Sequence, residues 1–323
     1  MIAEPEYREI IVEALTLLGG NLDRLVLTSP RIPTDRAFEV EQIVYQANLI
    51  FVEHNRKMGT LVLECCASGQ QCDGARGICR HFYDTAPAGD QIEATNIDQE
   101  LFNEYGFSVD QLMELAGLSC AKAIFHLYSG ENSAGRRVLF VVGPGNNGGD
   151  GLVCARHLKL FGFNPEIIYP KESKNEIMQR LVKQTRLMDI PYLDSVELLK
   201  LTISQYDLVV DAIFGFSFYP PIRQPFDEIL QIIGQGKPPI FSIDIPSGWH
   251  VENGPQEMDA SDGNKVTPIK PDVLISLTAP KLCARHFNGR AHVLGGRFVP
   301  QKLAKKYALN LPSYPSSNLF VQI

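Results

Sequence analysis

The sequence lacks the features that place a protein in a membrane or on a nucleic acid. Its 323 residues contain no run of about 18 apolar residues, the length that a bilayer-spanning helix needs. A formal net charge of −7 argues against binding to a phosphate backbone, which depends on clustered Lys and Arg. The start of the chain is acidic, unlike a basic secretory or mitochondrial leader. We therefore expect a cytoplasmic protein with no membrane or nucleic-acid partner.

Disulfide and zinc patterns are missing as well. Seven cysteines are an odd number in a long chain, which favours a reducing compartment over a disulfide framework. Four of them, Cys65, Cys66, Cys72 and Cys79, lie close together in the sequence, but not as the paired C-x-x-C chelates of a structural zinc site. We interpret them as ordinary thiols.

Several enzyme motifs are also absent. The chain has no Gly-x-Ser-x-Gly nucleophile elbow and no Ser-His-Asp order, and its seven histidines show no metal-ligand spacing. The chain has no Walker loop. It also lacks the dinucleotide-binding glycine loop that is followed by a ribose-binding acid. Hydrolase, P-loop and NAD(P)-dependent redox functions therefore lose support.

What is present divides the chain into two parts near residues 84–96, where turn and linker residues gather. Residues 1–95 predict a small helical N-terminal extension, with helices over residues 7–18 and 38–51. Residues 96–323 alternate between apolar strand patterns, at 138–142, 166–169, 208–213, 240–245 and 273–277, and helical patterns, at 151–160, 175–188, 195–201 and 226–233. Ser108 and Gln111 form a capping-box pattern before another helix. This alternation predicts an α/β domain with a doubly wound, mostly parallel sheet.

The strongest local motif lies between the first strand and the next helix. It reads Gly-Pro-Gly-Asn-Asn-Gly-Gly-Asp-Gly from Gly143 to Gly151. Glycines allow the backbone to approach a phosphate, and the start of a helix presents free N–H groups with the positive end of the helix dipole. The motif therefore predicts an anion site.

Two further strands end in polar residues. Asp211 lies near the end of the strand at 208–213, and Asp244 and Ser247 follow the strand at 240–245. Ligands of open α/β sheets bind at the carboxyl ends of the strands, so these residues should lie near Asn147. Oxygens of Asn147, Asp211 and Ser247 together suit a hard cation, a hypothesis that spacing alone does not decide.

These motifs resemble the NAD(P)H-hydrate epimerase family, also called YjeF N-terminal domain proteins and, in animals, apolipoprotein A-I-binding proteins. The resemblance includes the segments 99–117, 272–281 and 294–300 and covers about residues 96–315. It implies a Rossmann-like three-layer fold, a homodimer, and an isomerase that interconverts the R and S epimers of C6-hydrated NADH and NADPH. A partner dehydratase then restores the cofactor. The resemblance adds the mitochondrion and secretion as alternative locations, and apolipoprotein A-I as a further partner.

The resemblance also implies site residues. A potassium ion would be held by Asn147, Asp211 and Ser247. The substrate would be contacted by Asn146, Asn147, Gly148, Gly149, Asp150, Gly215, Phe216, Ser217, Phe218, Tyr219, Pro220, Pro221 and Asp244. For the reaction, we expect a carboxylic acid to protonate the leaving C6 hydroxyl, with Asp150, Asp211 and Asp244 as candidates.

The chain departs from the family pattern at three places, one of which is a longer loop over residues 251–270. Pro220 and Pro221 stand where relatives usually carry Gly-Asp, and His250 stands where an aspartate usually follows Ser-Gly-Trp. A non-catalytic dimeric scaffold or apolipoprotein-binding protein on the same fold is therefore the alternative function. The retained Asn-Asn-Gly-Gly-Asp and Ser-Ile-Asp-Ile-Pro-Ser-Gly motifs favour catalysis.

Overall fold

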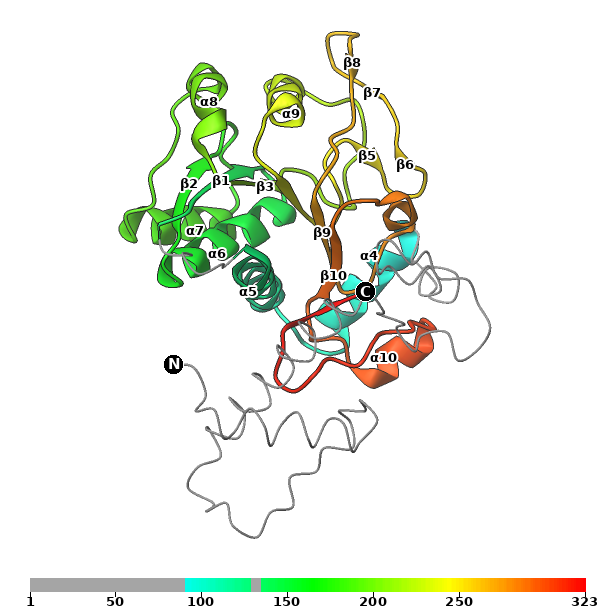
Figure 1. Cartoon of the computed structure of the whole chain (residues 1–323). Coiled ribbons are helices and arrows are strands. Elements are labelled where there is room, and N and C mark those ends of the chain that lie inside the picture. Colours follow the sequence, from blue (N-terminus) through cyan, green and yellow to red (C-terminus); the bar gives the residue numbers. More distant parts are fainter. Residues whose placement is uncertain (1–90, 129–134) are drawn as a thin grey trace, which may run out of the picture. The chain divides into compact units, whose positions relative to one another are not determined.

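The computed structural model describes residues 91–128 and 135–323. The helices predicted over residues 7–18 and 38–51 and the four clustered cysteines lie outside the described residues. In the described part, seven strands form one sheet in the order β11-β10-β9-β4-β3-β1-β2 (Figure 1). No helix of this part is long and apolar enough to cross a membrane.

Six of the seven strands run parallel, and only the edge strand β11 pairs antiparallel. Strands β3, β4, β9 and β10 are buried along their whole length, as expected for a sheet covered on both faces. The strands are β1 Arg137–Val142, β2 Asn164–Ile168, β3 Leu208–Ala212, β4 Ile240–Ile243, β9 Val273–Leu277, β10 Ala291–Gly295 and β11 Phe320–Gln322. Two short hairpins, β5 Trp249–His250 with β6 Gly254–Pro255 and β7 Met258–Asp259 with β8 Lys265–Val266, follow β4. The predicted fold class is confirmed.

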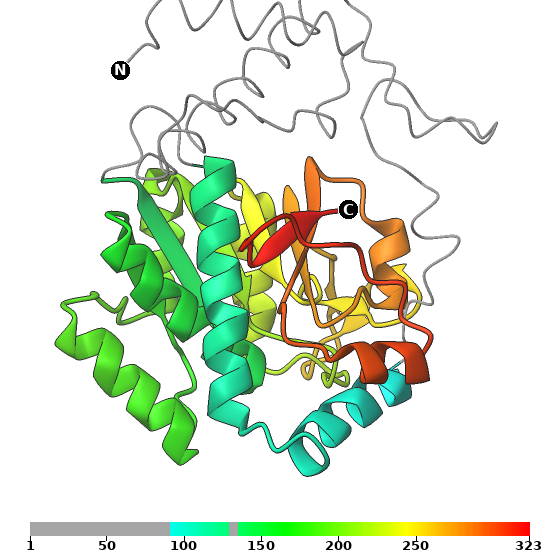
Figure 2. The same cartoon turned by 90° about the horizontal axis from the view of Figure 1, so that it is seen from below.

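Helices cover both faces of this sheet. Side chains of α5, α6 and α7 share one hydrophobic core with one face, and those of α8 and α9 share a second core with the other face. Helix α5 crosses the sheet as a long rod in Figure 2. The helices are α4 Gln91–Asn103, α5 Val109–Tyr128, α6 Asn146–Leu160, α7 Glu176–Leu187, α8 Val196–Thr202, α9 Phe226–Gln235 and α10 Gln301–Lys306, with 3-10 turns η4 Ile203–Gln205 and η5 Leu282–His286.

The start of α5 follows the predicted capping box. The backbone N–H of Ser108 donates to Gln111 Oε1 at 2.9 Å, and the N–H of Gln111 donates to Ser108 Oγ at 3.4 Å. The two side chains therefore satisfy backbone donors at the end of the helix, where no intrahelical partner exists.

Helix α4 was not expected, and it runs through the boundary that we placed between residues 95 and 96. Only Ile97 and Leu101 of this polar helix are buried. They pack in a small cluster with Leu112 of α5 and Leu303 of α10. Glu100 of α4 also accepts hydrogen bonds from Lys306 and Tyr307. These contacts fix α4 beside the carboxyl ends of the strands.

Candidate functional site

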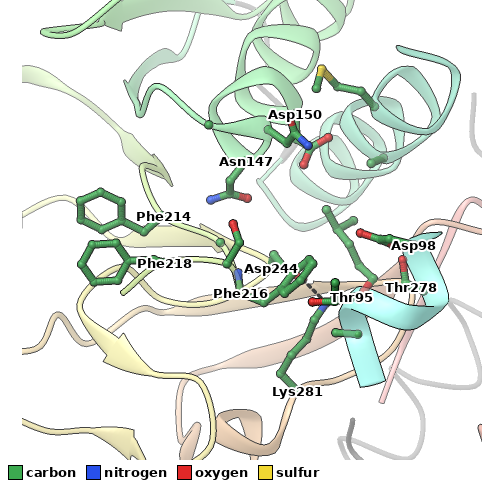
Figure 3. Close-up of a pocket in the computed structure, with 18 of the residues that line it drawn as sticks. Thr95, Asp98, Asn147, Asp150, Phe214, Phe216, Phe218, Asp244, Thr278 and Lys281 are labelled. Atoms are coloured by element: carbon green, nitrogen blue, oxygen red, sulfur yellow. Dashed lines mark hydrogen bonds and ion pairs between the residues drawn. The ribbon is translucent and has the colours of Figure 1, made fainter. Parts of the chain in front are cut away.

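A cavity of about 600 Å³ lies at the carboxyl ends of the central strands (Figure 3). Strand β1 continues to β2 on one side, and β3 continues to β4 on the other, so the strand order reverses between β1 and β3. Open α/β sheets bind their ligands at such a switch point. The charged and polar residues of the cavity wall include Thr95, Asp98, Asn146, Asn147, Asp150, Lys171, Arg223, Asp244, Thr278 and Lys281.

The glycine-rich motif forms the first turns of helix α6 rather than a loop. The helix begins at Asn146, five residues before the predicted start at Gly151, and Gly145 caps it without a side-chain hydrogen bond. Asn146, Asn147 and Asp150 all face the cavity. The free N–H groups of this helix end therefore lie at the cavity wall, as the predicted anion site requires.

The predicted substrate contacts at Gly148 and Gly149 do not line the cavity. A Cβ on Gly148 would lie 1.9 Å from the carbonyl oxygen of Gly143, and one on Gly149 would lie 2.3 Å from Met113 Sδ. These glycines allow α6 to pack closely on its neighbours. By contrast, a Cβ on Gly145 would meet nothing within 4 Å, and this glycine faces the cavity.

Asn147 is the least satisfied polar side chain of the site. It is buried, yet neither Oδ1 nor Nδ2 has a hydrogen-bond partner. Figure 3 shows its amide pointing from α6 toward Asp244 and the loop after β3. A buried amide without a partner costs free energy, about 1–3 kcal/mol. This amide therefore indicates a ligand that supplies the missing partner.

Asp211 lies in β3 below the cavity, where its carboxylate accepts four hydrogen bonds. Ser247 donates from its hydroxyl at 2.6 Å and from its backbone N–H at 2.8 Å, Ser242 Oγ donates at 2.8 Å, and the Ile213 N–H donates at 3.3 Å. Ser247 Oγ also accepts from the N–H of Phe214 at 3.0 Å, which ties the network to the loop after β3.

This environment separates Asp211 from the other two predicted acids. Burial raises the pKa of Asp211, and the hydrogen bonds from Ser247 and Ser242 oppose the rise. Asp211 is wholly buried and is not part of the cavity wall, whereas Asp150 and Asp244 are. The geometry therefore favours a positioning role for Asp211 over direct proton transfer.

Asp244 follows β4 in a left-handed backbone conformation, with φ of 65°. Its Oδ1 is bound by the ammonium group of Lys281, and its Oδ2 accepts from the N–H of Phe216 at 3.3 Å (dashed line in Figure 3). Lys281 also donates to the carbonyl oxygen of Leu277 at 2.9 Å. Thr278 has a φ of 67°, so a second strained residue lines the same cavity.

The acids of the cavity differ in charge preference. Burial raises the pKa of Asp150 well above its usual range, and the nearby Asp244 and Asp98 raise it further, while Lys281 opposes them. Burial also raises the pKa of Asp98 to about 6, opposed by Lys281 and assisted by Asp244. The surroundings of Asp150 therefore favour its protonated form, and Asp98 changes charge near pH 6.

Sequence analysis missed several polar residues of this cavity, among them Thr95, Asp98, Thr278 and Lys281. Lys281 closes the motif that carried the family resemblance, so its position after a buried strand was a usable signal. Asp98 gave no such signal, because it lies on a polar helix that only the folded chain brings to the cavity.

The aromatic loop after β3 lines the cavity largely as expected. The wall includes Gly215, Phe216, Ser217, Phe218, Tyr219 and Pro221, whereas Pro220 is not part of it. Phe218 stacks on Phe214 with ring centroids 4.0 Å apart.

The substituted residue His250 lies outside the cavity wall. Its Nδ1 accepts hydrogen bonds from the backbone N–H groups of Glu252 and Asn253, both at 3.2 Å. It therefore stabilises the β5–β6 turn.

Two of the three residues predicted to hold a cation, Asp211 and Ser247, are hydrogen-bonded to each other, and Ser247 also bonds the loop after β3, which passes close to Asn147. Ser247 bonds both Asp211 and Phe214, and the next residue, Gly215, has its Cβ position 3.3 Å from Asn147 Cβ. The unpartnered Oδ1 of Asn147 and the charge of Asp211 fit an alkali cation that prefers oxygen ligands. In the described part of the chain, no group of three or more His, Cys, Asp or Glu residues is arranged for a metal ion.

Fold and cavity define a Rossmann-like α/β domain with a ligand site at the switch point of its sheet. The family described as YjeF-related protein N-terminus matches residues 109–283. The chain is 52% identical over 234 residues to the NAD(P)H-hydrate epimerase of Aedes aegypti, covering 72% of this chain and 97% of that protein. The crystal structure of yeast YNL200c superposes with a TM-score of 0.66 at 40% identity, covering 73% of this chain and 99% of that chain. The chain belongs to the YjeF-related N-terminal domain family.

Proposed function

We propose that this chain is an NAD(P)H-hydrate epimerase, an isomerase that interconverts the R and S epimers of C6-hydrated NADH and NADPH. The observation that carries the proposal is the 52% identity to the mosquito epimerase over 97% of its length. The cavity supports it, because it combines an anion-binding helix end with several carboxyl groups.

The start of α6 suits the diphosphate of the substrate. Gly145 leaves room for a phosphate, and the first N–H groups of the helix have no side-chain cap. The diphosphate fixes the dinucleotide, so that the hydrated ring reaches the carboxyl groups.

The reaction begins with loss of the C6 hydroxyl. Asp150 donates its proton to that oxygen, the C6–O bond breaks, and the lone pair of ring nitrogen N1 forms a double bond to C6. Water leaves, and a cationic ring remains. The Asp244 carboxylate, held by Lys281 and Phe216, stabilises this positive charge. Water then attacks C6 from the opposite ring face, the electron pair of the double bond returns to N1, and the proton lost by the water passes to a carboxylate of the cavity, which gives the other epimer.

A potassium ion belongs to the proposal. Asn147, Asp211 and Ser247 would hold it, and Asn147 Oδ1 would gain the partner that it lacks within the protein. When bound, the ion would add positive charge to the site.

The proposed function is tested with a single epimer of hydrated NADH. We expect the protein to produce the other epimer, followed by chromatography, faster than the uncatalysed reaction, and to be faster in potassium than in a large organic cation. Asn147→Ala should remove most of the potassium dependence. No interconversion by the wild-type protein would favour the scaffold function.

The remaining partners follow from the same proposal. An S-specific dehydratase would consume the product, and the protein would act as a homodimer in the cytoplasm. Apolipoprotein A-I binding is a separate property, which a pull-down with the purified protein tests directly.

A further inference from the structure

Epimerisation at C6 requires proton transfer on both faces of the ring, which a single acid on one side of the cavity does not provide. The hydroxyl leaves from one face of the ring and returns to the other, so a proton has to be donated on one face and accepted on the opposite face. Two carboxyl groups on different walls of the cavity satisfy this demand. The following inference rests on the proposed epimerase function.

Three carboxyl groups line the cavity, and they are not equivalent. Asp244 has both oxygens engaged, one by Lys281 and one by the N–H of Phe216. Nothing in the described chain donates a hydrogen bond to the carboxyl groups of Asp98 or Asp150. Asp98 and Asp150 therefore keep free oxygens for a substrate.

These two carboxyl groups enter from different helices. Figure 3 shows Asp150 on α6 and Asp98 on α4, and both residues line the cavity. Helix α4 lies outside the residues 109–283 that match the family model. The residues that α5 contributes to the cavity wall are Val109, Leu112, Met113 and Ala116, which are all apolar.

We propose that Asp98 is the second proton-transfer residue of the epimerase and serves the ring face opposite to Asp150. Asp150 protonates the departing hydroxyl, and N1 supplies the electron pair that forms the N1–C6 double bond. A water molecule then attacks C6 from the other face, the electron pair returns to N1, and the proton lost by the water passes to the Asp98 carboxylate. Proton exchange with solvent restores Asp150 to the acid and Asp98 to the carboxylate. The reverse reaction exchanges the two roles.

The charges around Asp98 fit this cycle. Asp244, Asp150 and Lys281 interact electrostatically with it, and Lys171 and Arg223 are the other charged residues of the cavity wall. Burial, assisted by Asp244 and opposed by Lys281, raises the pKa of Asp98 to about 6. In both directions, the active enzyme carries one proton on the two carboxyl groups together, so the number of bound protons is the same for either epimer. The rate should therefore fall below pH 6 in both directions, as Asp98 also becomes protonated.

Asp98→Asn tests the proposal in the full chain. We expect kcat to fall at least about 100-fold with KM changed less than about threefold, and the loss of rate below pH 6 to disappear. Glu104→Gln removes an exposed carboxylate just after the same helix and outside the cavity, and should retain wild-type kinetics.

Asp98→Glu separates chemistry from structure. It should recover part of the rate and keep a pH-dependent loss at the acid side, and it replaces the Asn variant in the test if that variant fails to fold. An Asp98→Asn protein with wild-type kcat, or with an unchanged acid limb, would overturn the assignment while leaving the epimerase proposal intact. Absence of epimerisation in the wild-type protein would instead remove the proposed function itself.

Discussion

Asp98 is a carboxyl group that folding holds in a less favourable environment than water. Burial raises its pKa from 3.8 to about 6, so the folded chain binds this proton more tightly than the unfolded chain does. The carboxylate therefore costs stability, and the cost grows as pH rises from about 4 to about 6 and is constant above that.

This gives a stability prediction for the single residue. The free energy of unfolding of Asp98→Asn minus that of the wild type should increase by about 2 kcal/mol between pH 4 and pH 7. Urea unfolding at a series of pH values measures the difference, in which the contributions of the other acids cancel. A difference that does not change with pH would show that Asp98 is equally solvated in both states.

Individual site residues were predictable where a strand pattern preceded them. Asn147, Asp150 and Asp244 follow apolar strands in the sequence and line the cavity in the structure. Asp211 also belongs to such a strand, but its hydrogen bonds with Ser242 and Ser247 depend on the pairing of β3 with β4. Sequence spacing does not show whether a carboxylate at a strand end faces the ligand or the sheet.

Among the elements, α6 shows how close packing limits which side chains a helix at a ligand site can carry. A Cβ on Gly148 would lie 1.9 Å from the backbone oxygen of Gly143 in the preceding loop, whereas a Cβ on Gly145 would meet nothing within 4 Å. The two glycines are three residues apart, yet they are subject to different constraints.

We expect Gly148→Ala to destabilise the protein by about 3 kcal/mol, because α6 has to shift away from the sheet. Gly145→Ala should cost about 1 kcal/mol or less, because Gly is preferred to Ala at the N-cap of a helix but the added Cβ meets no steric conflict. Thermal unfolding of both variants measures the contrast. An equal loss of stability in the two variants would show that α6 accommodates a side chain at Gly148 without strain.

The elements themselves differed in how far the sequence predicted them. The apolar pattern gave β9 with its observed bounds, Val273–Leu277, because a strand buried on both faces is a continuous apolar run. Helix α4 was missed because only Ile97 and Leu101 of its residues are buried. The start of α6 was placed too late, since its glycines and asparagines have low helix propensity and packing overrides it.

At the scale of the whole molecule, one wall of the cavity is attached more weakly than the rest. The sheet and its helices share two large cores, whereas α4 is held by a separate small cluster around Leu101 and by the bonds of Glu100 to Lys306 and Tyr307. Local unfolding begins with the least stable unit, so α4 should separate from the domain before the sheet unfolds.

Leu101→Ala tests this arrangement. Removing a fully buried Leu side chain costs about 2–5 kcal/mol, and here the loss should fall on the docking of α4. Hydrogen exchange should become faster in α4 but not in α6, and epimerisation should slow because Asp98 leaves the cavity. The control variant Ile92→Ala changes a residue of the same helix that is 71% exposed, and it should alter neither the hydrogen exchange of α4 nor the rate of epimerisation. Faster exchange throughout the sheet would contradict a separate docking unit.

The positive φ of Asp244 narrows the residues that this position accepts during evolution. In a left-handed conformation, Asn and Gly are the replacements that cause the least backbone strain, while β-branched residues are strongly disfavoured. A descendant that abandons the chemistry but keeps the fold should therefore drift to Asn or Gly at this position. Such a replacement in a related sequence would mark a member of the family that has given up catalysis and survives as a binding protein.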